Sequence, residues 1–355
     1  MAAKVSSIGI YWSKPIRQQT VNPVKIILMN IHQVFESFNS LRVLVIGDVM
    51  LDSYVWGKVE RISPEAPVPV VNVSHREFRL GGAGNVLLNV QALGAEAIIC
   101  TVIGTDASGD SLKNSLIEKG LNCEGLIRSE SRITTIKERI IAGSQQVVRI
   151  DTETDKPIST EEKDRLVSKA KELIPSSNVI IFEDYDKGVL TAEAIAEITE
   201  YANEHNVPTV VDPKKRNFLS YNNVTLFKPN LKELREGLKV EFNVDDPEEL
   251  KQTVEQLKET LNAKGALITL SERGVYIDFK EETHKLPAHI RQIADVSGAG
   301  DTVISIAACC VALNLPPQSI AGISNLGGGL VCELVGVVPI DKALLKTEAE
   351  KEGLI

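Results

Sequence analysis

Residues 295–302 read Asp-Val-Ser-Gly-Ala-Gly-Asp-Thr, and an apolar run that favours a helix follows at residues 303–311. A Gly-Ala-Gly stretch that opens a helix lets successive backbone N–H groups converge on an anion, and the helix dipole adds to the attraction. Asp301, in the first turn, can then take a proton from a hydroxyl while those N–H groups stabilise charge on a transferring phosphoryl group. The acid also suits ordinary helix capping, and on spacing alone the two interpretations are about even.

Strands and helices alternate along the chain that leads to this stretch. The periodicity predicts helices over 85–93, 110–119, 160–173, 191–205, 230–238, 247–262, 300–313 and 317–333. It predicts buried strands over 41–46, 97–103, 179–182, 209–211, 225–228 and 266–270, and a hairpin over 274–293. Strands that alternate with helices in this way form a parallel sheet covered on both faces by right-handed crossovers. We therefore expect a doubly wound, mostly parallel α/β fold.

Two predicted β segments do not belong to this alternation of strands and helices. Residues 68–73 (VPVVNV) contain prolines that suit an edge strand or a separate sheet, and residues 134–141 and 146–151 flank a turn at Gly143. We expect residues 52–75 and 132–151 to form a small β lid that projects from the main sheet. The predicted organisation is an N-terminal extension over 1–40, partly disordered or one helix, then a domain over 41–345 and a C-terminal tail over 346–355.

Composition limits the class of protein. The 355 residues carry 39 Lys+Arg against 48 Asp+Glu, and the net charge of −9 makes the chain a poor candidate for binding nucleic acid or an anionic membrane. No apolar run reaches the ~18 residues of a membrane span, and the first 30 residues lack a secretory signal, so we expect a cytoplasmic protein. The cysteines are odd in number and lack zinc spacing, as in a reducing compartment: Cys100, Cys123, Cys309, Cys310 and Cys332.

Two further motifs are compatible with ligand binding. Residues 81–85 (GGAGN) allow close approach of the backbone, and Asn85 offers a donor and an acceptor to a polyhydroxylated ligand; a capped loop-to-helix turn is the alternative. Residues 230–233 (NLKE) place Asn230 and Glu233 on one helix face, a geometry that suits hydrated Mg²⁺ and phosphates. Taken alone, the second motif is better explained as a capping box.

The order and spacing of GGAGN, NLKE and DVSGAGDT resemble the ribokinase-like (PfkB) carbohydrate kinases over about residues 41–345, although Ser297 stands where Thr is commoner. Within that family the chain is similar to the kinases of D-glycero-β-D-manno-heptose 7-phosphate, which act in lipopolysaccharide synthesis. This narrower resemblance is carried by residues 47–52 (GDVMLD), 61–70 (RISPEAPVPV), 184–188 (DYDKG) and 212–214 (DPK), with Asp186 in place of the usual Ala. In many bacteria this kinase is fused to a nucleotidyltransferase; the chain has no HxGH motif, so the resemblance implies the kinase half alone.

The family resemblance implies a role for each motif. Asp301 is the expected catalytic base toward the anomeric hydroxyl, and Gly298, Ala299 and Gly300 are the expected anion hole for the γ-phosphoryl group. The expected sugar-binding residues are Asp52, Gly81, Gly82 and Asn85, with Asp48 as a further candidate for which loop capping is an equal alternative. Asn230 and Glu233 are expected to organise Mg²⁺ and ATP. Gly274 is expected to line the nucleotide site with Thr269 and Ser271, for which turn hydrogen bonding is an equal alternative.

A substrate that already carries a phosphate also requires cations. Lys137 and Arg139 lie two residues apart on a predicted strand and so share one face, as a phosphate clamp needs. Arg149 and Lys187 complete the candidate set, although any single basic residue on a hairpin is usually only solvated. The resemblance further implies that Asp295 and Ser297, with the loop at 331–340, can hold a monovalent cation such as K⁺.

The resulting hypothesis is an ATP-dependent kinase of heptose 7-phosphate that forms a homodimer through its lid. One alternative is a kinase of another sugar, such as ribose or fructose 1-phosphate. The other is a non-catalytic, ligand-sensing protein of the same fold. Such a sensor would have no need to retain Asp301 beside an intact Gly-Ala-Gly stretch.

Overall fold

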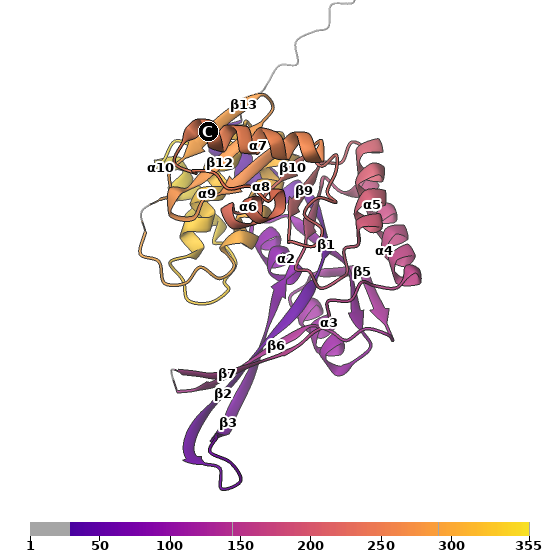
Figure 1. Cartoon of the computed structure of the whole chain (residues 1–355), viewed down its shortest axis with the longest axis vertical. Coiled ribbons are helices and arrows are strands. Elements are labelled where there is room, and N and C mark those ends of the chain that lie inside the picture. The colour runs from indigo at the N-terminus through magenta and orange to yellow at the C-terminus, as the bar shows by residue number, and fades with distance from the viewer. Residues whose placement is uncertain (1–28, 144, 290, 355) are drawn as a thin grey trace, which may run out of the picture.

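A nine-stranded sheet runs through the body of the molecule, which a computed structural model describes over residues 29–354 except 144 and 290 (Figure 1). Its strand order is β13-β12-β11-β10-β9-β8-β1-β4-β5. All neighbours from β11 to β5 are parallel, and β12 and β13 add an antiparallel hairpin at one edge. The bounds are β1 Arg42–Gly47, β4 Glu96–Gly104, β5 Asn122–Ser129, β8 Val179–Glu183, β9 Thr209–Asp212, β10 Leu226–Phe227, β11 Gly265–Thr269, β12 Val275–Phe279 and β13 Glu282–Leu286.

Helices cover both faces of this sheet. One face carries α1 Ile31–Ser37, α2 Ala83–Ala92, α3 Ala107–Glu118, α8 Ala299–Ala312, α9 Pro317–Val331 and α10 Lys342–Lys351. The other carries α4 Thr160–Leu173, α5 Ala192–Glu204, α6 Leu231–Leu238 and α7 Pro247–Leu261. Alternate residues of a strand therefore enter different cores: Val43 and Val45 of β1 join the first, whereas Leu44 and Ile46 join the second. The predicted doubly wound fold is confirmed.

Four long strands form the lid, an arm that projects from the body (Figure 1). They are β2 Val49–Ile62, β3 Pro69–Gly82, β6 Ile136–Ala142 and β7 Gln145–Thr152, in the order β3-β2-β6-β7. The pair β2–β6 is parallel, and the other two pairs are antiparallel. Because β2 begins two residues after β1 ends and β3 runs directly into α2, the base of the lid lies against the body sheet.

The two faces of the lid differ in chemistry, since side chains alternate along each strand. The pairings Asp52↔Lys137, Tyr54↔Arg139 and Arg139↔Arg149 gather charged and aromatic side chains on one face, called here the polar face. The pairings Ser53↔Phe78, Glu138↔Ile150 and Ile140↔Val148 place most of the apolar side chains on the opposite face, called here the apolar face, which also carries the ion pair of Glu138 with Arg76. Phe78, Val148 and Ile150 are 42%, 47% and 48% exposed, so the body leaves much of the apolar face uncovered.

The structure differs from the sequence expectation at β5 and in the expected tail, and it contains a helix in the N-terminal extension, which was one of the two alternatives for that segment. Strand β5 was not predicted, because its mixed sequence NCEGLIRS lacks alternation; its Gly125 lies so close to β4 that a Cβ atom would fall 2.3 Å from the Ile99 carbonyl oxygen. Helix α1, from the expected extension, buries Val34 and Phe35 in the core. Residues 346–351 of the expected tail belong to α10, which buries Ala349.

Residues 1–28 of the expected extension lie outside the described residues. Among the residues that are described, no helix combines the length and the apolar character needed to cross a membrane.

Candidate active site

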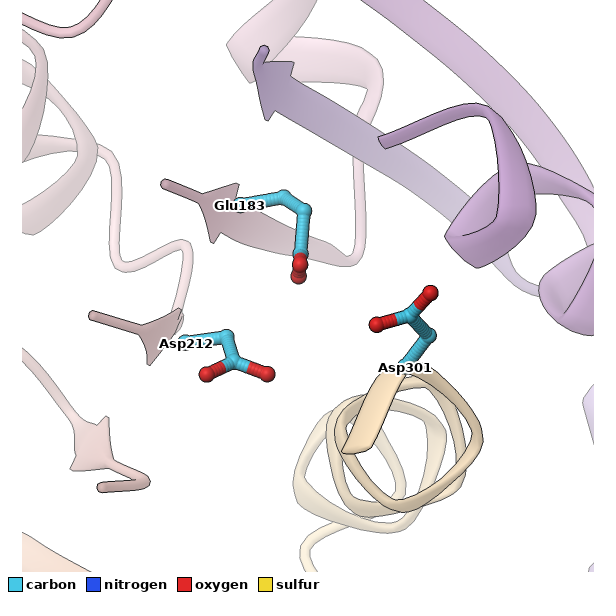
Figure 2. Close-up of side chains that lie close together, drawn as sticks. All are labelled: Glu183, Asp212 and Asp301. Atoms are coloured by element: carbon cyan, nitrogen blue, oxygen red, sulfur yellow. The ribbon is translucent and has the colours of Figure 1, made fainter. Parts of the chain in front are cut away.

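Three acidic side chains converge where the parallel strands end. Glu183 is the last residue of β8, Asp212 is the last residue of β9, and Asp301 lies in the first turn of α8, which faces those strand ends. Figure 2 shows the three side chains pointing toward one another, and their nearest carboxylate oxygens lie within 4.8 Å of each other. All three residues are buried. The carboxyl end of a doubly wound sheet is the usual place for a ligand site.

The Asp301 carboxylate is held by two donors from distant segments. Asn85 Nδ2 donates to Oδ2 at 2.6 Å, and the Tyr185 hydroxyl donates to Oδ1 at 2.9 Å. Burial, together with the negative charge of Asp212, raises the pKa of Asp301 to about 6, although the Asn85 hydrogen bond opposes the shift. A carboxylate with a pKa in this range can accept a proton near neutral pH. The GGAGN and DVSGAGD motifs thus meet directly at one carboxylate.

The glycines before Asp301 shape the entry to α8. Gly298 adopts φ 81° as the N-cap, a conformation that L side chains rarely adopt, and a Cβ atom there would lie 3.0 Å from Asn85 Nδ2. The Ala299 N–H donates to the Val296 carbonyl at 3.3 Å. The N–H groups of Gly300 and Asp301 lie in the first helical turn, which offers them no intrahelical acceptor. Of the predicted anion hole, the Ala299 N–H is therefore already engaged, whereas the N–H groups of Gly300 and the neighbouring Asp301 can face an anion.

A cleft of about 820 Å³ opens above the helix entry. Its floor contains the buried Lys228, whose Nζ lies 2.8 Å from Asp212 Oδ2. Lys214 Nζ contacts Glu233 Oε1 at 3.1 Å and lies over the Tyr185 ring. Although burial opposes it, the carboxylates of Asp212 and Glu233 raise the pKa of Lys214, so this lysine stays charged. The cleft joins a helix N-terminus to fixed cations, an arrangement suited to phosphates.

A more apolar pocket of about 400 Å³ adjoins the cleft and shares Thr269, Ser271, Val296 and Gly300 with it. Its remaining lining is mostly small or apolar and includes Gly274, Val275, Ala288, Val303 and Gly328. The three nucleotide candidates after β11, Thr269, Ser271 and Gly274, therefore lie together at this pocket. A flat, weakly polar ring can occupy such a space while attached phosphates extend into the cleft.

Asn230 and Glu233 form the capping box that their spacing favoured. Asn230 Oδ1 accepts from the Glu233 N–H, and Glu233 Oε2 accepts from the Asn230 N–H, both at 2.9 Å. Both residues also line the cleft. The two interpretations are thus compatible, because the cap fixes Glu233 with its other oxygen, Oε1, beside Lys214.

The lid supplies Asp52 to the other side of the site. Arg139 donates to Asp52 Oδ1 at 2.5 Å, and a Cβ atom at Gly81 would lie 2.5 Å from Asp52 Oδ2. Only glycine at position 81 leaves room for this carboxylate. Arg139 and Arg79 both lie over the Tyr54 ring, at 5.2 Å and 4.7 Å from its centroid. The polar face of the lid therefore presents two guanidinium groups next to the segment that leads into α2.

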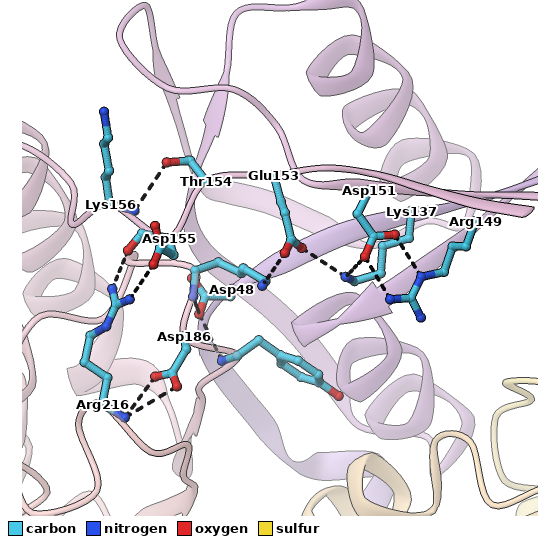
Figure 3. A network of polar contacts seen from close by, with 12 residues as sticks. Asp48, Lys137, Arg149, Asp151, Glu153, Thr154, Asp155, Lys156, Asp186 and Arg216 are labelled. Atoms are coloured by element: carbon cyan, nitrogen blue, oxygen red, sulfur yellow. Dashed lines mark hydrogen bonds and ion pairs between the residues drawn. The ribbon is translucent and has the colours of Figure 1, made fainter.

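The other cations expected to grip a phosphate are already paired with acids (Figure 3). Lys137 Nζ contacts Asp151 at 3.3 Å and Glu153 at 3.0 Å, and Lys187 Nζ contacts the same Glu153 at 2.9 Å. Arg149 Nε lies 2.9 Å from Asp151. The sequence indicated these cations but not the carboxylates that pair with them. A phosphate that binds here must displace the carboxylates or share the cations with them.

Asp48 occupies the loop-capping position rather than an open one. Its carboxylate accepts backbone N–H groups from Tyr185 at 2.9 Å, Lys187 at 3.0 Å and Val189 at 3.1 Å. Burial raises the pKa of Asp48, against the effect of these hydrogen bonds. The geometry thus favours the capping alternative: Asp48 fixes the loop that carries Tyr185 to Asp301, and it acts on the site through that loop.

Asp295 ties the helix entry to a second loop. Its Oδ1 accepts from the Ser297 N–H at 3.0 Å and hydroxyl at 2.8 Å, and its Oδ2 accepts from the Gly336 N–H at 2.9 Å. The hydrogen bonds from Ser297 lower the pKa of Asp295. The segment expected at a monovalent-cation site therefore does adjoin the loop at 331–340.

Five site residues were missed as candidates: Glu183, Tyr185, Asp212, Lys214 and Lys228. Each follows or ends a short buried strand, in the sequences VIIFEDY, TVVDPK and LFK. A polar residue at the carboxyl end of a parallel strand was the signal that could have found them.

Comparisons with known proteins agree with this geometry. The family model for pfkB family carbohydrate kinases matches residues 40–342. "Bifunctional protein HldE" of Desulfatibacillum aliphaticivorans is 40% identical over 327 residues, which cover 92% of this chain and 66% of the relative. The protein of the same name from Wolinella succinogenes is 39% identical over 300 residues, which cover 84% of this chain and 63% of the relative. The chain thus spans somewhat less than two thirds of these relatives.

Solved structures share the fold at low sequence identity. Tetrameric, inhibited phosphofructokinase-2 from Escherichia coli superposes with a TM-score of 0.72 at 17% identity, covering 87% of this chain and 99% of that one. Arabidopsis thaliana ribokinase complexed with ribose and ATP gives 0.66 at 15% identity, covering 86% and 98%. These structures establish the fold, and the family model establishes the class of enzyme. The chain therefore belongs to the pfkB family of carbohydrate kinases.

Proposed function

We propose that the protein transfers the γ-phosphoryl group of ATP to the anomeric C1 hydroxyl of D-glycero-D-manno-heptose 7-phosphate. The product would be heptose 1,7-bisphosphate, a precursor of ADP-heptose and of the lipopolysaccharide core, made in the cytoplasm. The observation that carries the proposal is the buried Asp301 carboxylate, held by Asn85 and Tyr185 at the entry of α8. The motifs shared with heptose kinases support this particular sugar.

Each group has a defined task in this reaction. Asp301 accepts the proton of the C1 hydroxyl, while Asn85 and Tyr185 fix the direction of its carboxylate. The N–H groups of Gly300 and Asp301 stabilise charge on the transferring phosphoryl group, and Lys228 adds a positive charge at the floor of the cleft. Asp52, Gly81, Gly82 and Asn85 are the groups proposed to contact the sugar.

The nucleotide is proposed to lie across the cleft and the adjoining pocket. Its base would occupy the space lined by Thr269, Ser271 and Gly274, and its phosphates would extend toward Lys214. Mg²⁺ that accompanies ATP neutralises phosphate charge when bound. Glu233 is the proposed residue for a hydrated ion there, because Asn230 fixes one of its oxygens at the cleft, and the ion's water would share the other oxygen with Lys214. The carboxylate and carbonyl oxygens around Asp295 and Ser297 suit K⁺.

The substrate phosphate is proposed to bind on the polar face of the lid. Arg139 is the leading candidate, because it lies next to Asp52 and over Tyr54. Lys137, Arg149 and Lys187 complete the set. All four cations, including Arg139 with its partner Asp52, must exchange or share an acidic partner when they bind the phosphate. This exchange is a source of specificity, because a sugar without a phosphate cannot compensate those acids.

A second copy of the chain is proposed to cover the apolar face of the lid. Exposed apolar β surface is unfavourable in water, and such surfaces commonly bind another protein chain. Phe78, Val148 and Ile150 supply such a surface, and it lies opposite the substrate face, so two lids can pair without blocking the sugar. Light scattering at micromolar concentration tests this: a dimer is expected, and a monomer contradicts it.

An ADP-release screen of the full chain against a panel of sugars and sugar phosphates tests the function. Heptose 7-phosphate should give the highest kcat/KM, with the unphosphorylated heptose far below it. A preference for ribose or fructose 1-phosphate would overturn the substrate assignment. Binding of a sugar without ADP release from any panel member would instead indicate a ligand sensor.

A further inference from the structure

Glu153 lies where the lid returns to the body, directly after β7, and its carboxylate bridges two lysines (Figure 3). Its Oε2 lies 3.0 Å from Nζ of Lys137 on β6, and its Oε1 lies 2.9 Å from Nζ of Lys187 on the loop between β8 and α5. One carboxylate thus joins the lid to the loop that carries Tyr185 to Asp301. Among the described residues, Glu153 is the only acid that pairs with Lys187.

The surroundings of Glu153 are those of an anion held in a site rather than of a charge on an open surface. Its side chain is 29% exposed, and those of Lys137 and Lys187 are each 18% exposed. Although burial opposes it, hydrogen bonds from Lys187 and Lys137 lower the pKa of Glu153, so its carboxylate is ionised at neutral pH. Each carboxylate oxygen contacts one lysine, as two oxygens of a phosphate group would.

The position of this bridge suits the sugar phosphate of the proposed reaction. Lys137 is paired in register with Asp52, a proposed sugar contact, and both lie on the polar face of the lid. The N–H group of Lys187 donates to Asp48, which also accepts the N–H group of Tyr185. A phosphate that joined the two ammonium groups would therefore contact both the sugar-binding side of the lid and the loop that orients the base.

We propose that Glu153 is a specificity-determining residue, an internal anion that occupies the phosphate site in the absence of substrate. A phosphate monoester carries ~1.5–2 negative charges at pH 7 and three strong acceptor oxygens, so it can replace Glu153 at both lysines with a net gain. A neutral sugar cannot replace it, and a ligand with one carboxylate gains nothing by exchanging like for like. Glu153 thereby penalises ligands without a phosphate. The inference rests on the proposed function, in which the substrate carries that phosphate.

Removal of the Glu153 charge should therefore strengthen phosphate binding. In Glu153→Gln the two ammonium groups lose their shared counter-ion when no substrate is bound, whereas the filled site keeps its phosphate. The change raises the free energy of the unliganded state alone and so increases affinity. Partly exposed ion pairs each contribute about two- to fivefold to an equilibrium constant, so the loss of two corresponds to roughly five- to twentyfold.

Steady-state kinetics of the full-length protein test the proposal. Glu153→Gln should lower the KM for heptose 7-phosphate roughly five- to twentyfold, with the KM for ATP and that for unphosphorylated heptose changed by less than about twofold. Inorganic phosphate should inhibit the wild type by competing with the sugar phosphate, and its Ki should fall in the variant by the same factor as the KM. The effect of Glu153→Gln should be much smaller in a Lys187→Ala background, as expected for residues that share one interaction.

Glu197→Gln is the matched control, because Glu197 also contacts two lysines, Lys163 at 2.7 Å and Lys171 at 3.8 Å, on the helical surface of the body. It should change neither KM nor the Ki of phosphate. An unchanged or higher KM in Glu153→Gln, an equal fall for both sugars, or no phosphate inhibition of either protein would overturn the inference. If the wild type does not prefer a phosphorylated sugar, the proposed function fails instead, and the Ki of inorganic phosphate still decides whether Glu153 competes for the site.

Discussion

The body sheet and the lid sheet differ in how far their strands are buried and in where their charged side chains lie. In the body, β1 and β8 are buried on both faces, and acids of the candidate site stand where strands end, as at Glu183 and Asp212. In the lid, every residue of β7 is exposed, and the strand carries the charged side chains of Arg149 and Asp151 in its second half. The body therefore fixes a few acids rigidly at one edge, whereas the lid presents many paired charges to solvent.

This difference assigns separate tasks to the two regions. Groups that transfer a proton or stabilise charge act best when they are buried and preorganised, as Asp301 is. Groups that recognise one substrate among many can be exposed, because each ion pair on a surface contributes little until a ligand replaces it. We expect changes in the body to lower turnover and changes in the lid to alter substrate affinity.

The largest effect is expected in the body, from Asp301→Asn. The variant keeps the shape of the side chain and removes the proton acceptor, and general-base catalysis typically contributes ~10²–10⁴-fold. The kcat should fall by about that factor while ATP binding, measured by calorimetry, is retained. Asp164→Asn is the control, because that exposed acid on α4 pairs with Lys163. Turnover within a few fold of wild type would exclude Asp301 as the base.

A smaller and different effect is expected in the lid, from Arg139→Ala. A charge-assisted hydrogen bond to phosphate contributes ~1.5–3 kcal/mol, which is about ten- to a hundredfold in affinity. The KM for heptose 7-phosphate should rise by that factor, with the KM for ATP nearly unchanged and any trace activity on the unphosphorylated sugar unaffected.

Two further variants sharpen this lid experiment. Arg76→Ala removes another ion pair of the lid, that with Glu138, and should change neither KM. Lys187→Ala tests the same phosphate assignment at the loop. If Arg139→Ala and Lys187→Ala weaken the phosphorylated and unphosphorylated sugars equally, both residues support the lid or the fold instead.

The pH dependence of kcat/KM tests the body separately from the lid, because it should follow the Asp301 carboxylate alone. Because the pKa of Asp301 is raised to about 6, the base is ionised above that pH and protonated below it. The kcat/KM should be level above pH 6 and should fall about tenfold per unit on the acid side, as expected for one required deprotonated group. Arg139→Ala should show the same fall of kcat/KM on the acid side of the pH profile. If kcat/KM falls only below about pH 4, the site does not raise the pKa of Asp301.

The smallest effect on catalysis is expected from the apolar face of the lid. Val148→Lys with Ile150→Lys adds charge where a second chain is proposed to pack, so light scattering should report a monomer. Exposed substitutions change stability by only about 0.5 kcal/mol, so turnover at saturating substrate should stay within about twofold. Thr152→Lys, at the end of the same strand, is the control and should remain dimeric. A dimer that persists in the double variant would place the interface elsewhere.

The sequence predicted the body better than the site. Buried strands and capped helices have local signals, and apart from β5 and α10 the predicted elements correspond to those of the described residues. The GGAGN, NLKE and DVSGAGD motifs were also visible, because glycines and caps leave a local pattern. The convergence of Glu183, Asp212 and Asp301 has no such pattern, since it depends on which strands become neighbours in the sheet. Ion pairs such as Lys187 with Glu153 depend on tertiary approach in the same way.

The hydrogen bonds to Asp301 have a consequence for how the protein matures. Asn85 and Tyr185 reach this carboxylate from 216 and 116 residues away in the chain. Contacts this distant in sequence form late in folding, because long loops must close before they are made. A nascent or partly folded chain therefore has no oriented base, even where its strands and helices are already present. The proposed phosphoryl transfer therefore requires the chain to be folded from α2 to α8.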